Sequence, residues 1–155
     1  MPQVHLTRIV EAPVFAVWDA WDDYMNIDRY NPNISRSFAI GDGADTGLGA
    51  TRQCDLIDGK NYIQERIVDY VPQSHMGIDI FNGTMPLKSA RADIRMRDLG
   101  QGRTELTFTM TFVPKMGILG RLMVPMMKSQ FSKLLGELVD ANKVFVETGR
   151  EVARG

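Results

Sequence analysis

Two charged residues with the potential for acid–base chemistry, Arg52 and Glu65, occupy matching places in two neighbouring segments that alternate apolar and polar residues. Between the segments lies Asp58-Gly59, a pair typical of a two-residue β-hairpin turn. A hairpin with this turn pairs Cys54 with Ile63 and Arg52 with Glu65, and directly paired residues point to the same face of a sheet. The sequence therefore predicts an arginine and a glutamate opposite each other on an otherwise apolar wall.

Two hypotheses account for such a pair. Isolated charges in apolar surroundings cost on the order of several kcal/mol, and pairing offsets only part of that cost. Arg52 and Glu65 could form a structural ion pair that satisfies itself or reaches solvent near the sheet edge. Alternatively, they form a polar anchor inside a ligand cavity, in which Glu65 accepts a hydrogen bond from a ligand hydroxyl or acts as an acid or base.

The surrounding pattern predicts the elements that hold this pair. Apolar and polar residues alternate from Ile34 to Val113 and predict six strands, at about 34–40, 48–57, 60–70, 75–82, 87–98 and 104–113. An earlier strand is expected at about 4–11, followed by two short helices, one entered through Pro13 and one at about 22–30. The last strand has one apolar and one polar face, which is typical of an antiparallel sheet.

The later strands extend the apolar wall. A loop at 99–103 that pairs Asp98 with Thr104 sets Ala92 opposite Met110 and Ala90 opposite Phe112. Such small residues leave volume for a large neighbour or for a ligand, and dense packing is the usual outcome in a protein interior. The expected ligand-binding residues of the sheet are Arg52, Cys54, Ile63, Glu65, Ile78, Ile80, Ala90, Ala92, Phe108 and Met110.

The segment from Gly117 to Glu147 has the clearest helical period in the chain. Its apolar side predicts a helical wall for the same cavity, formed by Met123, Met126, Met127, Gln130 and Leu134. Methionine suits surfaces that adapt to varied apolar partners, but these residues could equally fill a core. Pro125 either kinks this helix or lies in the first turn of a helix that begins near Val124.

Composition excludes several classes of protein. The 155 residues predict one domain over 1–155, and the net charge of −1 argues against nucleic-acid binding. No apolar run reaches about 18 residues, so we expect no integral membrane segment. The N-terminus lacks a signal-peptide pattern, which favours a cytoplasmic protein. One cysteine and two histidines make a metal site unexpected, and we expect no cofactor.

The element order predicts an α+β fold in which a seven-stranded curved antiparallel sheet wraps around one long C-terminal helix. Several short motifs appear in a recognisable order, namely Ile9-Val10-Glu11-Ala12-Pro13, Val17-Trp18, Tyr30-Asn31-Pro32-Asn33-Ile34, Gly47-Leu48-Gly49-Ala50-Thr51-Arg52 and Glu65-Arg66-Ile67-Val68-Asp69-Tyr70. With these motifs and the long helix, the chain resembles the START-like or SRPBCC superfamily, whose helix-grip (Bet v 1/START-like) fold includes bacterial polyketide cyclase/dehydrase-like proteins. The resemblance implies an apolar cavity between sheet and helix.

The first functional hypothesis is the binding of a hydrophobic or amphipathic small molecule, such as a lipid, polyketide or isoprenoid, in this cavity. The alternative is a polyketide cyclase/aromatase/dehydratase-like enzyme, in which Arg52 and Glu65 move protons or stabilise an enolate. Only these two residues qualify as acid–base groups, so binding ranks first. A third hypothesis is an interaction module whose exposed apolar rim binds another protein. The oligomeric state stays open.

Overall fold

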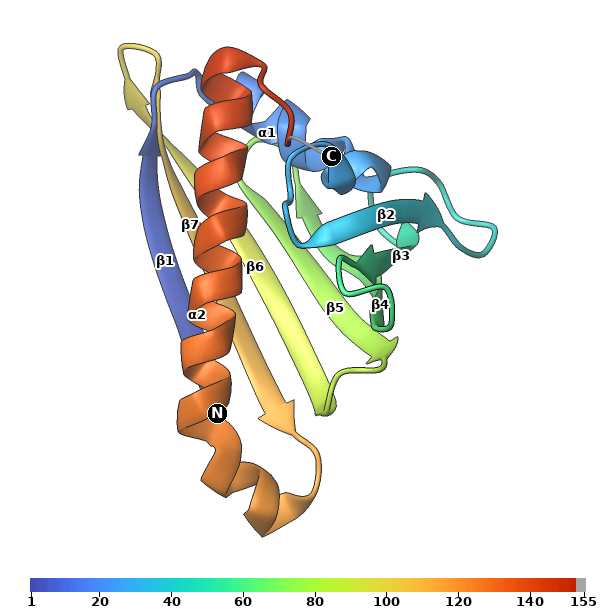
Figure 1. Ribbon diagram of the computed structural model, residues 1–155. Coiled ribbons are helices and arrows are strands. Elements are labelled where there is room, and N and C mark those ends of the chain that lie inside the picture. The colour runs from blue at the N-terminus through green and yellow to red at the C-terminus, as the bar shows by residue number, and fades with distance from the viewer. Residues whose placement is uncertain (153–155) are drawn as a thin grey trace.

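The computed structural model describes residues 1–152 and consists of an open, curved antiparallel sheet with a long helix along one face (Figure 1). The elements are β1 (Gln3–Val10), α1 (Val14–Asp22), η1 (Tyr24–Arg29), β2 (Ile34–Ala39), β3 (Thr51–Leu56), β4 (Tyr62–Val71), β5 (His75–Gly83), β6 (Leu87–Gly100), β7 (Arg103–Pro114) and α2 (Gly117–Thr148). The seven strands lie in the order β1-β7-β6-β5-β4-β3-β2. This confirms the predicted sheet and long C-terminal helix, while positions 153–155 of the expected domain lie outside the described residues.

The two short elements after β1 close one end of the molecule. α1 begins directly after Pro13, whose carbonyl oxygen accepts hydrogen bonds from the N–H groups of Ala16 and Val17. η1 is a 3₁₀ helix rather than an α-helix, and it is shorter than the segment predicted at 22–30. Asn26 interrupts it with non-helical backbone angles, φ −113° and ψ 28°.

The β3–β4 hairpin has the predicted register. Cys54 pairs with Ile63 and Arg52 pairs with Glu65. Asp58 Oδ1 accepts hydrogen bonds from two backbone N–H groups of the turn, and Gly59 has φ +74°, which a side chain would disfavour. The hairpin therefore fixes both charged residues on the inner face of the sheet.

β3 begins later than predicted, at Thr51 instead of position 48. Gly47 and Gly49 both have positive φ, +87° and +86°, and this backbone conformation does not continue a strand. The expected strand start therefore belongs to the connection between β2 and β3.

α2 lies along one side of the sheet rather than over its centre. It packs mainly on β1 and β7, and it runs apart from β3, β4 and β5 (Figure 1). Polar contacts fasten its C-terminal half to β1: Lys143 Nζ donates to the carbonyl of Ile9 at 2.7 Å, and the Glu11 N–H donates to Glu147 Oε2 at 2.7 Å. The backbone of α2 therefore lies on the β1–β7 side of the sheet, away from β3, β4 and β5.

The buried side of α2 is rotated from the predicted one. Its buried residues are Gly120, Met127, Phe131, Leu138, Val139 and Asn142. Met123 and Met126 are exposed, with 43% and 49% of their surface accessible, and Gln130 is exposed as well. Pro125 lies inside one continuous helix that begins at Gly117, so of the two alternatives the structure has the helix that runs through this proline and not the one that starts near Val124.

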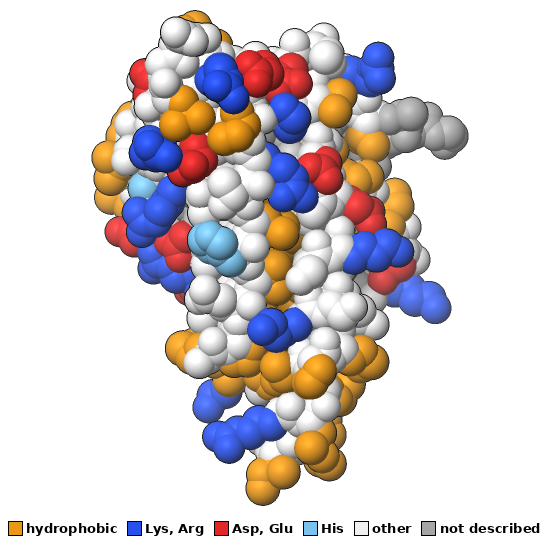
Figure 2. Space-filling view, turned by 90° about the vertical axis from the view of Figure 1, so that its left-hand side faces the viewer, with side chains coloured by type: hydrophobic (Ala, Val, Ile, Leu, Met, Phe, Trp, Pro, Cys, Tyr) orange, Lys and Arg blue, Asp and Glu red, His pale blue; other side chains and the backbone are white. Residues whose placement is uncertain are grey.

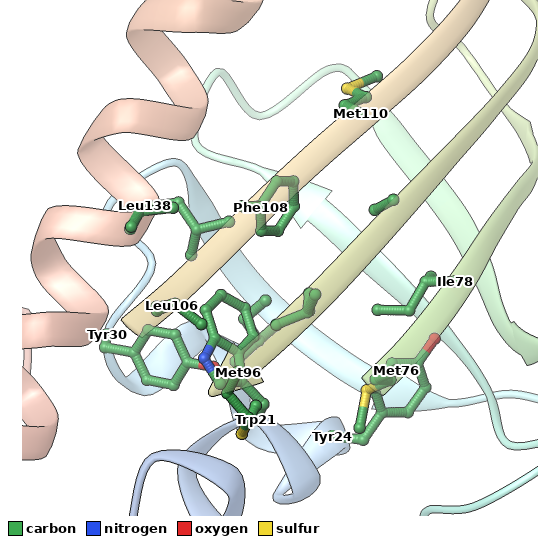
Figure 3. Packing of buried hydrophobic residues seen from close by; sticks show 14 of the residues in the cluster. Trp21, Tyr24, Tyr30, Met76, Ile78, Met96, Leu106, Phe108, Met110 and Leu138 are labelled. Carbon is green, nitrogen blue, oxygen red and sulfur yellow. The ribbon is translucent and has the colours of Figure 1, made fainter. Parts of the chain in front are cut away.

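Aromatic side chains fill the space between sheet and helix at the end closed by α1 and η1. The Trp21 ring lies 5.8 Å from that of Tyr30 and 6.0 Å from that of Phe108, between centroids. Tyr30 stacks on Phe145 of α2 at 5.2 Å, and Figure 3 shows Trp21 and Tyr30 converging beside Leu106. These aromatic contacts join α1, the segment after η1, β7 and α2 at this end of the molecule.

Candidate functional site

A cavity of about 140 Å³ lies between the inner face of the sheet and α2. That volume has room for roughly ten water molecules, so it exceeds an ordinary packing defect. Ile78, Phe108 and Met110 project into the region from β5 and β7 (Figure 3). The site is a largely apolar chamber, which is the usual character of small-molecule pockets.

The cavity has a buried end and a partly exposed end. Arg52 and Glu65 lie at the buried end, with 3% and 6% of their surface accessible. Met85, Leu87 and Leu134 also line the cavity but remain partly exposed, so they mark its mouth. The charged groups are therefore reached through an apolar passage.

Most of the predicted sheet wall lines this cavity. The predicted residues that line it are Arg52, Cys54, Ile63, Glu65, Ile78, Ile80, Ala92, Phe108, Met110 and Leu134. β6 and β7 pair as expected, with Ala92 opposite Met110 and Ala90 opposite Phe112. The predicted registers of the β3–β4 and β6–β7 hairpins thus place seven of these side chains, those of Arg52, Cys54, Ile63, Glu65, Ala92, Phe108 and Met110, on the inner face of the sheet.

Five predicted residues do not line the cavity: Ala90, Met123, Met126, Met127 and Gln130. Ala90 is buried, and its partner on β7, Phe112, packs edge-to-face on Phe131 with 5.0 Å between the ring centroids. Ala90 therefore faces packed core side chains and not the cavity. Met127 is buried in the hydrophobic core. Met123, Met126 and Gln130 point to the surface because α2 is rotated relative to the prediction.

The sequence reasoning missed part of the wall, namely Trp21, Ile27, Asn31, Asn33, Ile34, Leu56, Met85, Leu87, Ile94, Phe131, Leu135 and Leu138. Ile94 and Leu56 were detectable, because each shares the alternation of a predicted strand. Ile27, Asn31, Asn33 and Met85 come from a short 3₁₀ helix and from loops, whose direction no periodic pattern reveals, whereas Ile34 and Leu87 are the first residues of β2 and β6. One of them, Asn33, joins β2 to α2 by donating from Nδ2 to the Leu134 carbonyl at 3.4 Å.

Arg52 and Glu65 form a fully buried ion pair. The Nε and Nη2 atoms of Arg52 both lie 3.1 Å from the same oxygen, Glu65 Oε1. Arg52 Nη1 also donates to the backbone carbonyl of Tyr24, and its guanidinium carbon lies 3.8 Å from the centre of the Tyr24 ring. Burial alone would lower the pKa of Arg52, but the Glu65 charge keeps that pKa above its ordinary value.

Cys54 completes this cluster. Its thiol donates to Glu65 Oε1 at 3.3 Å. Burial is the largest effect on this thiol; together with the smaller effect of the Glu65 charge it outweighs the opposing effect of Arg52 and raises the pKa of Cys54 to about 12. The sulfur therefore stays a protonated hydrogen-bond donor at neutral pH and is a poor nucleophile.

The second carboxylate oxygen of Glu65, Oε2, accepts no hydrogen bond from residues 1–152, whereas Oε1 accepts all the bonds described above. Glu65 lines the cavity. Across residues 1–152, no three His, Cys, Asp or Glu side chains gather into a group that could hold a metal ion. At the buried end of the cavity, Glu65 Oε2 is thus a hydrogen-bond acceptor in apolar surroundings.

Comparison with known proteins places this geometry in context. The profile of a family described as polyketide cyclase / dehydrase and lipid transport matches residues 1–143. No curated protein matches the sequence.

Solved structures share the fold over nearly the whole chain. The ZhuI aromatase/cyclase from Streptomyces sp. R1128 superposes with a TM-score of 0.80 at 16% identity, covering 94% of this chain and 93% of that one. A START superfamily protein from Mycobacterium smegmatis gives 0.79 at 18% identity, covering 95% and 98%. Norcoclaurine synthase from Thalictrum flavum gives 0.73 at 14%, covering 93% and 92%. These likenesses confirm the helix-grip fold of the START-like superfamily.

Proposed function

The chain belongs to the polyketide cyclase/dehydrase and lipid transport family, and from that premise we propose that it binds a hydrophobic or amphipathic small molecule in the cavity between the sheet and α2. The apolar wall would hold the body of the ligand, and the buried charged cluster would orient one polar end. A few placed polar groups in an apolar pocket are how such sites fix orientation.

The observation that carries this proposal is the free oxygen of Glu65. Oε2 lacks a donor among the described residues, while Arg52 already donates to Oε1 and to the Tyr24 carbonyl. A ligand hydroxyl that donates to Oε2 would gain a charge-assisted hydrogen bond, which is stronger than a bond between two neutral groups. A ligand carboxylate would meet the Glu65 charge instead, which favours neutral alcohols or phenols over acids.

No helix within residues 1–152 is long and apolar enough to cross a membrane. In the proposed complex, side chains from the sheet, η1 and α2 would surround the ligand.

Native mass spectrometry of the freshly purified protein, followed by solvent extraction, tests the proposal directly. We expect an added mass that solvent releases and that proves to be a neutral, largely apolar compound. Ala92→Leu, which fills the cavity, should lose that mass and serves as the matched control.

A pair of probes of equal size tests the role assigned to Glu65. Naphthol should bind and naphthoate should not, because only the former donates a hydrogen bond to the carboxylate. Trp21 lines the cavity and Trp18 does not, so naphthol should change the fluorescence of a Trp18→Phe variant and leave that of Trp21→Phe unchanged. Equal binding of the two probes would contradict the role of Glu65, and binding of neither would contradict the cavity as a site.

The enzymatic alternative rests on the position of one acid–base group, Glu65, inside the cavity. A cyclase or dehydratase could use its carboxylate to take a proton from a bound chain. Turnover of a polyketide-like substrate that Glu65→Gln abolishes, with the affinity for naphthol retained, would favour the enzyme over the binding protein.

A further inference from the structure

The first turns of α2 carry large apolar side chains that nothing in the described chain covers. Met116, Ile118, Leu119, Leu122, Met123 and Met126 have between 43% and 76% of their surface exposed. We call residues 115–128 the α2 tip. Each of positions 118, 119, 122, 123 and 126 lies three or four residues from another member of the set, so these side chains form one continuous apolar face of the helix.

This apolar face is accompanied by positive charge alone. From Leu106 to Gly136 the sequence contains no Asp or Glu, yet it contains Lys115, Arg121, Lys128 and Lys133. None of the four cations forms an ion pair with the described residues. Figure 2 shows hydrophobic and basic side chains gathered at the lower end of the molecule, where α2 begins in Figure 1. The charge is local, since the whole chain has a net charge of −1.

The α2 tip adjoins the mouth of the cavity. The Lys115 N–H donates to the carbonyl of Pro86 at 3.0 Å, which joins the tip to the β5–β6 turn. Met85 of that turn and Leu87, the first residue of β6, line the cavity mouth, and residues 80–92 also lack Asp and Glu. Apolar and basic groups therefore surround the entrance from two sides.

We propose that the α2 tip docks onto the surface of an anionic lipid bilayer. Its exposed apolar side chains enter the boundary between headgroups and acyl chains, and Lys115, Arg121 and Lys128 contact the acidic headgroups. Docking in this orientation turns the cavity mouth toward the lipid. This surface function goes beyond ligand binding and does not depend on it.

Charge distinguishes the bilayer from a second copy of the chain. A two-fold symmetric interface places the same patch against itself, so a dimer through the α2 tip would bring its cations together with no acidic residue to offset them. An anionic membrane offers the opposite charge and an apolar interior at the same surface, which matches both halves of the patch.

Sedimentation with vesicles tests the proposal. The full chain should sediment with vesicles of equal parts phosphatidylcholine and phosphatidylglycerol, and much less with phosphatidylcholine alone. High salt should weaken the binding, because it screens the headgroup charge. Failure to bind the mixed vesicles at low salt would overturn the proposal.

Matched variants locate the surface. Leu122→Asp should weaken vesicle binding at least about tenfold, because it places a negative charge on the docking face. Leu48→Asp is the control, since Leu48 is similarly exposed (67% against 75%) but belongs to the β2–β3 connection. Equal loss in both variants, or in neither, would overturn the proposal. Circular dichroism and thermal unfolding would confirm that both variants are folded.

The cations are tested separately. Replacing Arg121 and Lys128 together by alanine should weaken binding about twenty-fold or more, since each cation near an anionic surface contributes roughly a fivefold gain. Arg103→Ala, at the first residue of β7, should leave binding unchanged. Size-exclusion chromatography tests whether the α2 tip binds a second copy of the chain. If the wild-type protein is a dimer that does not bind vesicles, and Leu122→Asp converts it to a monomer, the tip serves self-association and the proposal is overturned.

Discussion

Arg52 binds Glu65 through two nitrogens that converge on one oxygen, Oε1, each at 3.1 Å. A side-by-side arrangement would have occupied both carboxylate oxygens. The converging arrangement leaves Oε2 unbonded beside the cavity, and it makes one ion pair serve both as part of the wall and as an acceptor.

Breaking this ion pair should destabilise the fold strongly. Arg52→Met leaves the buried Glu65 carboxylate without its cation, and we expect a loss of about 3–5 kcal/mol in the free energy of unfolding. Arg52→Met combined with Glu65→Leu should recover most of that loss, because no unpaired charge remains. Urea unfolding at neutral pH measures both. A double variant no more stable than Arg52→Met alone would contradict the assignment of the cost to the unpaired charge.

Two alanines on the same strand should respond differently to enlargement. Ala92→Val adds methyl groups toward open space and should change the free energy of unfolding by less than about 1 kcal/mol. Ala90→Val adds them within the packed core under Phe112 and should cost about 1–3 kcal/mol. Thermal unfolding of the two variants checks the difference, and similar losses would argue that the cavity is not open space.

Stability should decline at alkaline pH because of Cys54. Burial raises the pKa of this thiol from 9.0 to about 12 in the folded protein. Between these values the unfolded chain loses the proton and the folded chain keeps it, so stability present below pH 9.0 is lost as the pH rises toward 12. The contribution is at most about 1.4 kcal/mol per pH unit.

Urea unfolding at a series of pH values from neutral to alkaline measures this decline. Cys54→Ala should be less stable at neutral pH but show a shallower decline. Burial also raises the pKa values of Tyr24 and Tyr30, so part of the decline should persist in the variant. An unchanged slope in Cys54→Ala would contradict the assignment to the thiol.

Two glycines of α2 should have opposite effects when replaced by alanine. At Gly136 an added Cβ would meet only Arg8 Nη2, at 4.0 Å, so Gly136→Ala should stabilise the helix by about 0.5–1 kcal/mol. At Gly120 the Cβ would lie 2.1 Å from the carbonyl oxygen of Lys115, so Gly120→Ala must displace the start of the helix. Thermal unfolding should show a rise for the first variant and a fall for the second.

The sequence predicted the sheet better than the position of the helix. The Asp58-Gly59 turn fixes the β3–β4 register, and with it the pairing of Arg52 with Glu65, because a strand shifted by one residue would turn its side chains to the other face. Strand alternation likewise identified Ala92 opposite Met110.

The orientation of α2 was harder to predict because its first turns are apolar on more than one side. Leu122 and Met126 are exposed while Met127 and Phe131 are buried, and a helical wheel alone gives no preference between two apolar faces. The choice is made by the contacts of α2 with β1 and β7, which depend on distant parts of the chain. The non-periodic cavity residues, such as Asn33 and Met85, escaped prediction for the same reason.

Because α2 packs on β1 and β7, the residues that attach the helix differ from many of the residues that would contact a ligand. Residues that hold the helix lie on one side of the sheet, whereas β3, β4 and β5 supply the charged pair and much of the cavity wall. Substitutions at distant, independent sites have nearly additive effects on stability. The apolar part of the wall on β3, β4 and β5 can therefore change toward new ligands with little effect on the contacts that attach α2 to β1 and β7.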